Sequence, residues 1–396
     1  MKKALIIIGG STLQLPAIRR AKELGLYTVV TDRNADAPGR AAADRFVLLD
    51  GTDVEGFIRV GEDVSRSYRI CGAFAGSDFG LPAVAALNGH FRLPGASALS
   101  VRLALDKSLS KDIWIRKGIC TPAGAIISGK DDLRAAVERF GFPVILKPVN
   151  ASGSRGIRSA ADYDELDSAY ESARGISGKV LAEKLLHGTH LDVNGVFHDG
   201  GFHECGILER MFSPPPFHYP VKGVTPPDYK DCALLYSLLE RSARALGITG
   251  GPVKGDVIVT KDGPFIIELA PRFHGEVSTS FVLPLAGMDP VRAWFESLNG
   301  GKEFKMQKGD RAAGWAGLFP NEGGRVASVS GLDEAAALEG VSVMITRKPG
   351  EVVKKPADNT ALCGFVWAAG QSREQALASL DKACSFIRFE TETEAA

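Results

Sequence analysis

The amino-acid sequence predicts a protein of mixed α/β and α+β class that folds as more than one unit. Its first quarter alternates apolar strands with helical patterns, which is typical of a parallel sheet. Later in the chain, two β-branched apolar runs flank a short Asp-Gly loop, which indicates an antiparallel hairpin. The length of 396 residues corresponds to two or three structural units.

Composition narrows the range of functions. Basic and acidic residues both number 47, so no net charge attracts nucleic acid or an anionic membrane. No apolar run is long enough to span a bilayer, and the run at residues 4–8 is too short for a signal peptide. The six cysteines lie singly without a C-x-x-C pair, which predicts reduced thiols in a cytoplasmic protein. We therefore expect small-molecule partners, with neither nucleic acid nor membrane.

The first unit, expected at residues 1–98, begins with a strand–helix–strand pattern that ends at Asp32. An acid there is typical of a dinucleotide-binding domain, although the glycines at residues 9–10 lack the G-x-G-x-x-G spacing. A turn of this kind before a helix binds any anion, so a nicotinamide site is only an alternative. The predicted elements are strands at residues 4–8, 27–31, 46–49 and 72–75 and a helix at 14–24.

The second unit, expected at residues 99–300, places Lys147 within an apolar strand at 142–149. A lysine there is rarely buried without a partner. Residues 150–157 are small and include a cation, so they predict a flexible loop that covers a phosphate; a plain hairpin turn is the alternative. Other expected elements are a helix through residues 105–111, strands at 123–128, 180–186 and 191–197, helices between 128 and 141, at 162–174 and at 230–246, and a long Pro-rich loop at 211–229.

A hairpin over residues 255–270 carries two acids whose pairing depends on its turn. With a three-residue loop at 261–263, Asp256 lies opposite Glu268, and the two carboxylates repel each other unless a cation lies between them. Hard oxygen ligands of this kind favour Mg²⁺. With a two-residue turn at 262–263, the register slips by one and the carboxylates face opposite sides of the sheet.

The loop after the hairpin favours the first of these arrangements. Arg272 carries a planar guanidinium that binds carboxylates and phosphoryl groups through two hydrogen bonds, although a surface arginine is the plainer alternative. His274 and Gly275 share this loop. We predict that these three residues form the catalytic group.

The third unit, expected at residues 301–396, is of α+β type and ends in an acidic tail. The tail is expected to be disordered from Glu390 onward. The predicted elements are strands at residues 312–319, 341–346 and 364–368 and helices at 331–339 and 373–386.

Five motifs follow one another along the chain: Asp106-Lys107, the strand of Lys147, the loop at residues 152–156, Glu183-Lys184-Leu185-Leu186, and the pair Asp256 and Glu268. In this order, they resemble the motifs of the ATP-grasp superfamily of carboxylate–amine ligases. The resemblance covers nearly the whole chain. It implies an ATP-grasp fold with an N-terminal Rossmann-like pre-grasp unit, a lid at roughly residues 120–185 and a C-terminal α+β domain.

The resemblance also implies ligands for ATP and for Mg²⁺ (or Mn²⁺). The residues that it assigns to ATP are Lys107, Lys147, Ser152, Gly153, Ser154, Arg155, Gly156, Glu183, Lys184, Leu185, Leu186 and His190. It assigns Asp256 and Glu268 to the metal ion, and Arg272 to the oxyanion of the acyl centre. Three positions depart from the family pattern: His190 replaces an acid that often binds ribose, Ala270 replaces a frequent Asn, and Lys254 stands where many relatives have His.

Two subfamilies match different parts of the chain. The stretch from Glu268 to His274 is similar to purine-pathway ligases that carboxylate aminoimidazole ribonucleotide or formylate glycinamide ribonucleotide, whereas residues 147–156 and 348–366 are similar to the L-amino acid (dipeptide) ligases. We favour the latter. That resemblance implies that the carboxylate of an amino acid or small organic acid is joined to an amine through an acyl phosphate, with release of ADP and phosphate, by a homodimer. The alternatives are a purine-pathway-like ligase, a nucleotide-dependent dehydrogenase, and a non-catalytic nucleotide-binding relative.

Overall fold

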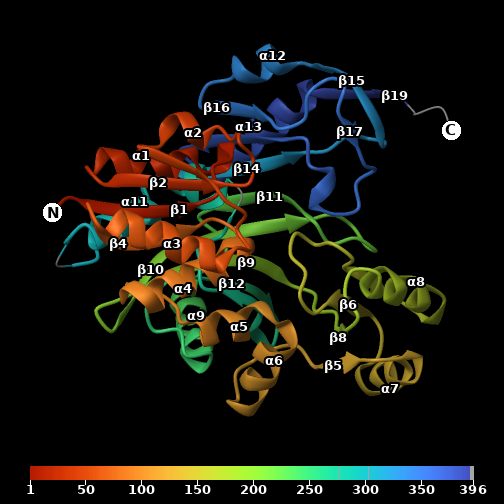
Figure 1. Ribbon diagram of the computed structural model, residues 1–396. Coiled ribbons are helices and arrows are strands. Elements are labelled where there is room, and N and C mark those ends of the chain that lie inside the picture. Colours follow the sequence, from red (N-terminus) through yellow and green to blue (C-terminus); the bar gives the residue numbers. More distant parts are fainter. Residues whose placement is uncertain (276, 302, 393–396) are drawn as a thin grey trace.

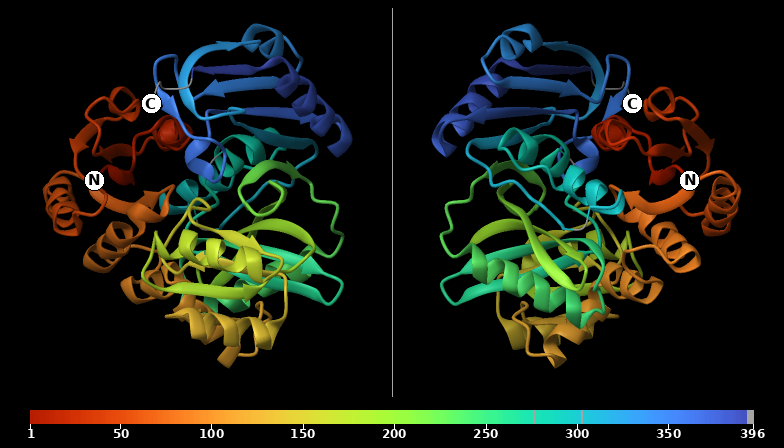
Figure 2. Two further views of the ribbon diagram at one scale, coloured as in Figure 1. Left: turned by 90° about the vertical axis from the view of Figure 1, so that its right-hand side faces the viewer. Right: turned by 90° about the vertical axis from the view of Figure 1, so that its left-hand side faces the viewer.

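The computed structural model describes residues 1–275, 277–301 and 303–392 of the chain. The strands form a parallel N-terminal sheet, a lid sheet, a long central sheet and a small C-terminal sheet (Figure 1). In the two turned views, the blue C-terminal elements lie above the green central strands, and the red N-terminal elements lie beside both (Figure 2). Among the described residues, no helix combines the length and the apolar character needed to cross a bilayer.

The N-terminal part is a parallel sheet covered by helices, as the strand–helix–strand pattern predicts. Its elements are β1 (Lys3–Ile8), α1 (Leu15–Glu23), β2 (Tyr27–Asp32), α2 (Gly39–Ala42), β3 (Arg45–Leu48), α3 (Val54–Ser65), β4 (Arg69–Ala75) and α4 (Leu81–Phe91). The strand order is β3-β2-β1-β4. Helices on both faces explain why β1 is apolar throughout: Leu5 and Ile7 pack with α1, and Ile6 packs with α3 and α4 on the other face.

The turn after β1 is closed by groups of the chain itself. The Gly9 N–H donates to the Thr31 carbonyl at 2.8 Å. The Gly10 N–H donates to Asp32 Oδ2 at 2.7 Å. Asp32, the acid that suggested a dinucleotide site, therefore accepts a hydrogen bond from the backbone of the turn. This geometry gives no support to the dehydrogenase alternative.

The lid is an antiparallel sheet with two helices on one face. Its elements are β5 (Gly124–Ile127), α7 (Lys130–Phe140), β6 (Val144–Pro148), β7 (Arg158–Ala160), α8 (Tyr163–Arg174) and β8 (Val180–Lys184), with the strand order β5-β8-β6-β7. Leu133, Val137 and Phe140 recur at helical spacing, and this apolar stripe packs α7 against the sheet. The opposite face of the lid sheet is therefore left to face the central sheet.

The helix predicted through residues 105–111 is broken in two, into α5 (Ala98–Leu105) and α6 (Lys107–Arg116). Asp106 is extended, with φ −98° and ψ 105°, and its carboxylate accepts hydrogen bonds from the N–H groups of Ser108 and Leu109. It is thus the N-cap of α6 rather than a residue within one helix. The Lys107 N–H donates to the Val149 carbonyl at 3.0 Å, so the break fixes Lys107 beside the end of β6.

The central sheet begins with strands that form the floor of the site. Its first elements are β9 (Thr189–His198), β10 (Gly201–Phe212), β11 (Pro220–Thr225), α9 (Cys232–Ala245), β12 (Gly251–Thr260) and β13 (Gly263–Ala270). Leu235 and Leu239 of α9 pack on one face of these strands. The prediction of one long loop at residues 211–229 is wrong, because β10 runs to Phe212 and pairs with β11 within that range. The prolines at residues 214–216 interrupt only the connection between the two strands.

The β12–β13 hairpin confirms the facing acids and corrects the turn. Thr260 pairs with Gly263, so the loop contains two residues (261–262) rather than three. That turn alone would place Asp256 opposite Ile267. A β-bulge between Asp256 and the next residue of β12 skips Ile267 and brings Asp256 opposite Glu268.

The C-terminal part extends the central sheet and adds a small sheet above it. Its elements are α10 (Leu283–Leu285), α11 (Pro290–Leu298), β14 (Ala312–Leu318), β15 (Gly324–Ser330), α12 (Leu332–Ala336), β16 (Val341–Ile345), β17 (Val352–Val353), β18 (Gly364–Gly370), α13 (Arg373–Phe386) and β19 (Arg388–Glu392). The complete central sheet has the order β13-β12-β9-β10-β11-β14-β18-β16. It runs across the boundary expected at residue 300, and the three unit boundaries stay a prediction.

The acidic tail begins as a strand. Residues 388–392 form β19, which pairs with β15, so the disorder expected from Glu390 is wrong for the first residues of the tail. Pairing with a strand more than 50 residues earlier is not visible in the local pattern. Residues 393–396 lie outside the described part of the chain.

Candidate active site

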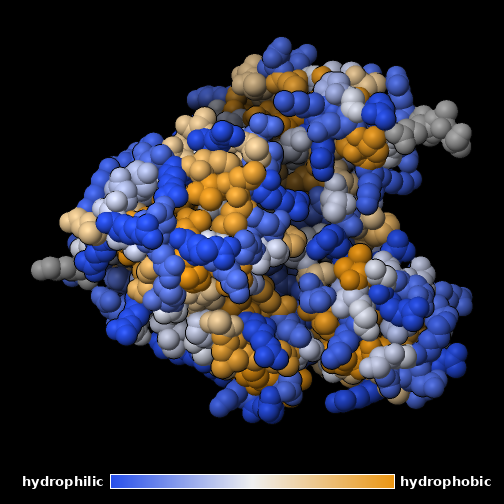
Figure 3. Space-filling model, in the orientation of Figure 1, coloured by the Kyte–Doolittle hydropathy of each residue, from blue (hydrophilic) through white to orange (hydrophobic). Residues whose placement is uncertain are grey.

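A cavity of about 330 Å³ lies between the lid sheet and the central sheet, a size typical of small-molecule sites. In Figure 3 the surface is notched between the C-terminal part above and the lid below. Both parts contribute to the cavity wall, through Asn359 and through residues 151–154. The predicted site residues that line it are Lys107, Lys147, Ser152, Gly153, Ser154, Glu183, Lys184, Leu185, Leu186, His190, Asp256, Glu268, Arg272, His274 and Gly275. Arg155 and Gly156 lie in the same loop but not in the wall.

Two lysines meet a fully buried acid at the lid end of the cavity. Lys147 Nζ lies 2.5 Å from Glu183 Oε2, and Lys111 Nζ lies 2.5 Å from Glu183 Oε1. Burial raises the pKa of Glu183, but Lys147 and Lys111 outweigh it and lower the pKa below its usual value. The group thus carries net positive charge. Lys111 was missed from sequence, although it follows Lys107 by four residues and shares its face of α6.

Removing Lys111 should loosen this group. In a Lys111→Met variant, Glu183 keeps only Lys147, and we expect a loss of stability of about 1–3 kcal/mol. Affinity for an ATP analogue should also fall, because Lys147 is then held by an otherwise unpaired carboxylate. Thermal melting and calorimetric titration measure the two effects. The matched control is Lys130→Met, whose ammonium is exposed and pairs with Asp167; equal behaviour of the two variants would contradict the assignment.

The loop of residues 150–157 is held from behind and presents its tip to the cavity. Lys107 Nζ donates to the Ala151 carbonyl at 2.7 Å, and the Asn359 N–H donates to the Gly153 carbonyl at 3.3 Å. Gly156 has φ +71°, and a Cβ there would lie 2.9 Å from the Ser172 carbonyl, so only glycine fits. Arg155 turns back on the loop, where its Nε donates to the Ser152 carbonyl at 3.1 Å.

A phosphate-covering loop should become protected when nucleotide binds. We expect trypsin cleavage after Arg155 to slow when an ATP analogue and Mg²⁺ are added. Cleavage after Lys230, a residue with a 91% exposed side chain outside the cavity wall, serves as the internal control. Unchanged cleavage at Arg155 with bound nucleotide would count against a covering role.

The side of the cavity that carries residues 183–186 and His190, which the resemblance assigns to ATP, is built from β8 and a neutral histidine. The Lys184 N–H donates to the Ala123 carbonyl at 2.9 Å and the Leu185 N–H donates to the Pro143 carbonyl at 3.0 Å, which fixes the strand. His190 lies 4.6 Å from the Phe212 ring, centroid to centroid. Burial lowers the pKa of His190 to about 4, so its imidazole is neutral at pH 7. The role of these residues toward a nucleotide stays a prediction.

The facing acids of the hairpin are bridged by a lysine. Lys254 Nζ lies 3.2 Å from both Asp256 carboxylate oxygens and 2.8 Å from Glu268 Oε1. Lys107 Nζ lies 3.2 Å from Glu268 Oε2. Burial raises the pKa of Glu268, but Lys107 and Lys254 outweigh it and hold the pKa at about 2. Burial also raises the pKa of Asp256, but Lys254 and His274 outweigh it and lower the pKa well below its usual value, so both acids are ionised at neutral pH.

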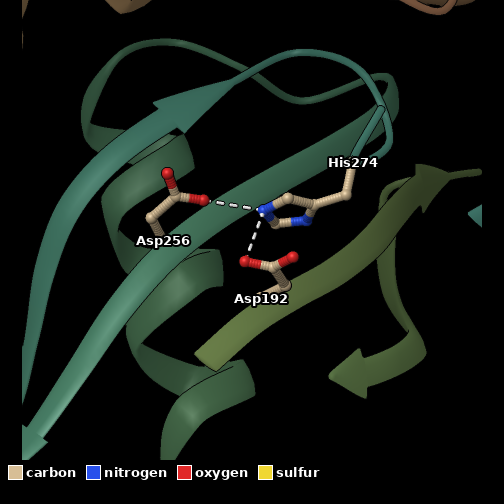
Figure 4. A group of neighbouring side chains, drawn as sticks. All are labelled: Asp192, Asp256 and His274. Atoms are coloured by element: carbon tan, nitrogen blue, oxygen red, sulfur yellow. Dashed lines mark hydrogen bonds and ion pairs between the residues drawn. The ribbon is translucent and has the colours of Figure 1, made fainter. Parts of the chain in front are cut away.

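A third acid continues this row across the sheet. Asp192 of β9 is the register partner of Asp256 in β12, and Figure 4 shows His274 pointing between the two carboxylates. His274 Nε2 lies 2.7 Å from Asp256 Oδ1 and 3.2 Å from Asp192 Oδ1. Arg210 Nε lies 2.9 Å from Asp192 Oδ2. Carboxylate oxygens and an imidazole nitrogen in one cluster suit a divalent cation, and the carboxylates suit Mg²⁺ in particular.

Asp192 and Arg210 were missed from sequence, and the available signal was weak. Asp192 and Asn194 interrupt an apolar strand at alternate positions, which places both polar side chains on one face. Asn194 Oδ1 accepts a hydrogen bond from the backbone N–H of His274 at 2.9 Å. This contact holds the His274 loop against β9.

Arg272 connects the site to the N-terminal part. Its Nε donates to Asp78 Oδ1 at 2.7 Å, and its Nη1 donates to the Phe273 carbonyl at 2.9 Å. Asp78 follows β4 in the turn η2 (Asp78–Gly80), at the carboxyl end of a parallel strand, where ligands of open sheets bind. A Cβ on Gly275 would lie 3.2 Å from the Gly76 carbonyl, so the two loops touch closely. The plain surface arginine is therefore excluded, while a catalytic role stays a prediction.

Comparisons with known proteins find two family matches and several relatives. The ATP-grasp domain family matches residues 140–280, and the family of L-amino acid ligase C-terminal domain 2 matches residues 317–392. The uncharacterized protein y4rH of Sinorhizobium fredii is 24% identical over 98% of this chain and 83% of its own length. A D-alanine–D-alanine ligase of Cupriavidus metallidurans is 28% identical over 44% of this chain, and the match spans only 56% of that enzyme.

Solved structures share the fold over almost the whole chain. The L-amino acid ligase from Bacillus licheniformis has a TM-score of 0.86 at 20% identity, with 99% of both chains covered. The N5-carboxyaminoimidazole ribonucleotide synthetase from Thermotoga maritima has a TM-score of 0.75 at 20% identity, with 99% of this chain and 100% of that chain covered. At these identities the likeness concerns the fold.

Proposed function

We propose that this chain, an ATP-grasp domain protein that carries the second C-terminal domain of L-amino acid ligases, joins the carboxylate of an amino acid or small organic acid to an amine. It is a carboxylate–amine ligase that forms a C–N bond and releases ADP. The observation that carries the proposal is the meeting of several cationic side chains with a row of carboxylates in one cavity. Those proposed to act on the substrates are Lys107, Lys147 and Arg272.

ATP occupies the cavity with its phosphates toward the lysines. Lys147 and Lys107 reach it from β6 and α6, and the tip of the loop at residues 152–154 supplies N–H groups above the phosphates. The base lies toward residues 183–186 and the neutral His190. Asp256 and Glu268 would hold Mg²⁺, which when bound would neutralise phosphate charge.

The reaction has two steps in which this chain positions charged reactants. An oxygen of the substrate carboxylate attacks the γ-phosphorus, the bond to the β-phosphate oxygen breaks, and an acyl phosphate and ADP form. The amine then adds to the acyl carbon, loses a proton, and phosphate leaves with the C–O bond electrons. Arg272 stabilises the oxyanion of this second step. Both steps rest on positioning and electrostatic stabilisation, so no side-chain nucleophile is required.

The acid and the amine can be identified by a screen of amino acids and small carboxylates, with ADP release measured and products identified by mass spectrometry. Acid-dependent and amine-dependent ADP release with an amide product is the expected result. ATP binding without ADP release under every mixture would support a non-catalytic relative instead.

We place the protein in the cytoplasm, because all six cysteines are unpaired in the structure, as suits a reducing compartment. We propose a homodimer on the resemblance to the family alone. Analytical ultracentrifugation measures the second point directly.

A further inference from the structure

We infer that the ammonium of Lys254 takes the place of a metal cation, so that the site binds a single divalent ion together with the nucleotide. The inference rests on the proposed function, because it assumes that a metal–nucleotide complex enters this cavity.

Lys254 lies where a cation between the two carboxylates would lie. Its Nζ contacts both oxygens of Asp256 and one oxygen of Glu268 at 2.8–3.2 Å. Only 3% of the residue is exposed, so bulk solvent does not screen these contacts. The lysine is therefore a cation held inside the site between two carboxylates.

The opposite strand is shaped to admit this side chain. Ala270 is the register partner of Lys254, and directly opposed residues of an antiparallel pair point to the same face. A methyl group there leaves space for the lysine stem, whereas an amide side chain would compete for it.

Local charge balance leads to the same conclusion. Each carboxylate of the row contacts a cationic side chain: Glu268 contacts Lys107, and Asp192 contacts Arg210. Asp256 contacts Lys254. One divalent ion that arrives with the negatively charged nucleotide can share Asp256 and Glu268 with Lys254. A second ion would lie beside a buried ammonium, and each carboxylate of the row that could offset the repulsion between them already contacts a cationic side chain.

Metal stoichiometry tests the inference on the unmodified protein. Equilibrium dialysis with Mn²⁺ and a non-hydrolysable ATP analogue, read by electron paramagnetic resonance, should give one bound Mn²⁺ per nucleotide-bound chain. Two ions per chain would overturn the inference and leave the proposed function standing. Absence of nucleotide binding would overturn both.

A neutral replacement of similar length tests the same point without nucleotide. In a Lys254→Met variant, Asp256 and Glu268 lose their shared cation, and Mn²⁺ binding should tighten by about tenfold or more. Lys130→Met, on the exposed surface of the lid, should bind Mn²⁺ like the parent. If Lys254→Met folds, as judged by its melting transition, and its Mn²⁺ affinity equals that of the parent, the inference is wrong. If it does not fold, the stoichiometry of the parent decides.

Discussion

A Glu268→Gln variant is expected to lose Mg²⁺-dependent ADP release while it keeps its fold. Glu268 is ionised at neutral pH, with a pKa held at about 2, so the substitution removes a full negative charge at nearly constant shape. That charge holds Lys254 and Lys107 and is a proposed ligand of the metal ion. We expect ADP release to fall by about a hundredfold or more, the size of effect seen when one preorganised group of a reaction site is removed.

The control for this variant is Glu240→Gln. Glu240 is a helix-surface acid that pairs with Arg244 on α9 outside the cavity wall. A coupled ADP assay at saturating Mg²⁺ compares the two variants, and thermal melting confirms that both are folded. Turnover of Glu268→Gln near the level of Glu240→Gln would falsify the metal assignment.

Sequence patterns were most informative for strands and loops that are determined by interactions between residues close in the sequence. Apolar runs located β6 and β9, and the small residues after β6 located the loop that faces the cavity, because burial and turn chemistry act over a few neighbours. The lysine in an apolar strand also led correctly to a buried partner, since Lys147 meets Glu183 at 2.5 Å. These features needed no knowledge of how distant strands pair.

The parts that depend on strand pairing were not predictable from local pattern. Asp256 was expected opposite Glu268 from a three-residue turn, but the actual turn is shorter and a bulge at Ile267 compensates. The pairing of Asp256 with Glu268 was therefore predicted correctly, but from a turn that the hairpin does not have. Asp192 joins these acids only because β9 pairs with β12, more than 50 residues later. Nothing in a single sequence fixes that neighbour.

Arg272→Ala should separate a ligase from a bare nucleotide binder. Arg272 lies in the cavity wall beyond Glu268, and its Nε is held by Asp78. If the guanidinium stabilises charge that develops at the acyl centre, it acts on the transition state more than on bound ATP. Removing such a donor costs about a hundredfold to a thousandfold in rate, or about 2.7–4 kcal/mol. We therefore expect near-normal affinity for an ATP analogue and loss of most acid-dependent ADP release.

Two further variants distinguish direct action of Arg272 from a structural link to the N-terminal part. Arg272→Lys should recover little activity, because an ammonium cannot reproduce the planar fork. Asp78→Asn keeps the guanidinium but weakens its ion pair, so it should cost less than Arg272→Ala. Calorimetric titration with an ATP analogue, set beside a coupled ADP assay, measures binding and turnover for each. Equal losses in Asp78→Asn and Arg272→Ala would assign Arg272 to holding the η2 turn. Lost nucleotide affinity with normal turnover at saturating ATP would instead move Arg272 to the phosphate site.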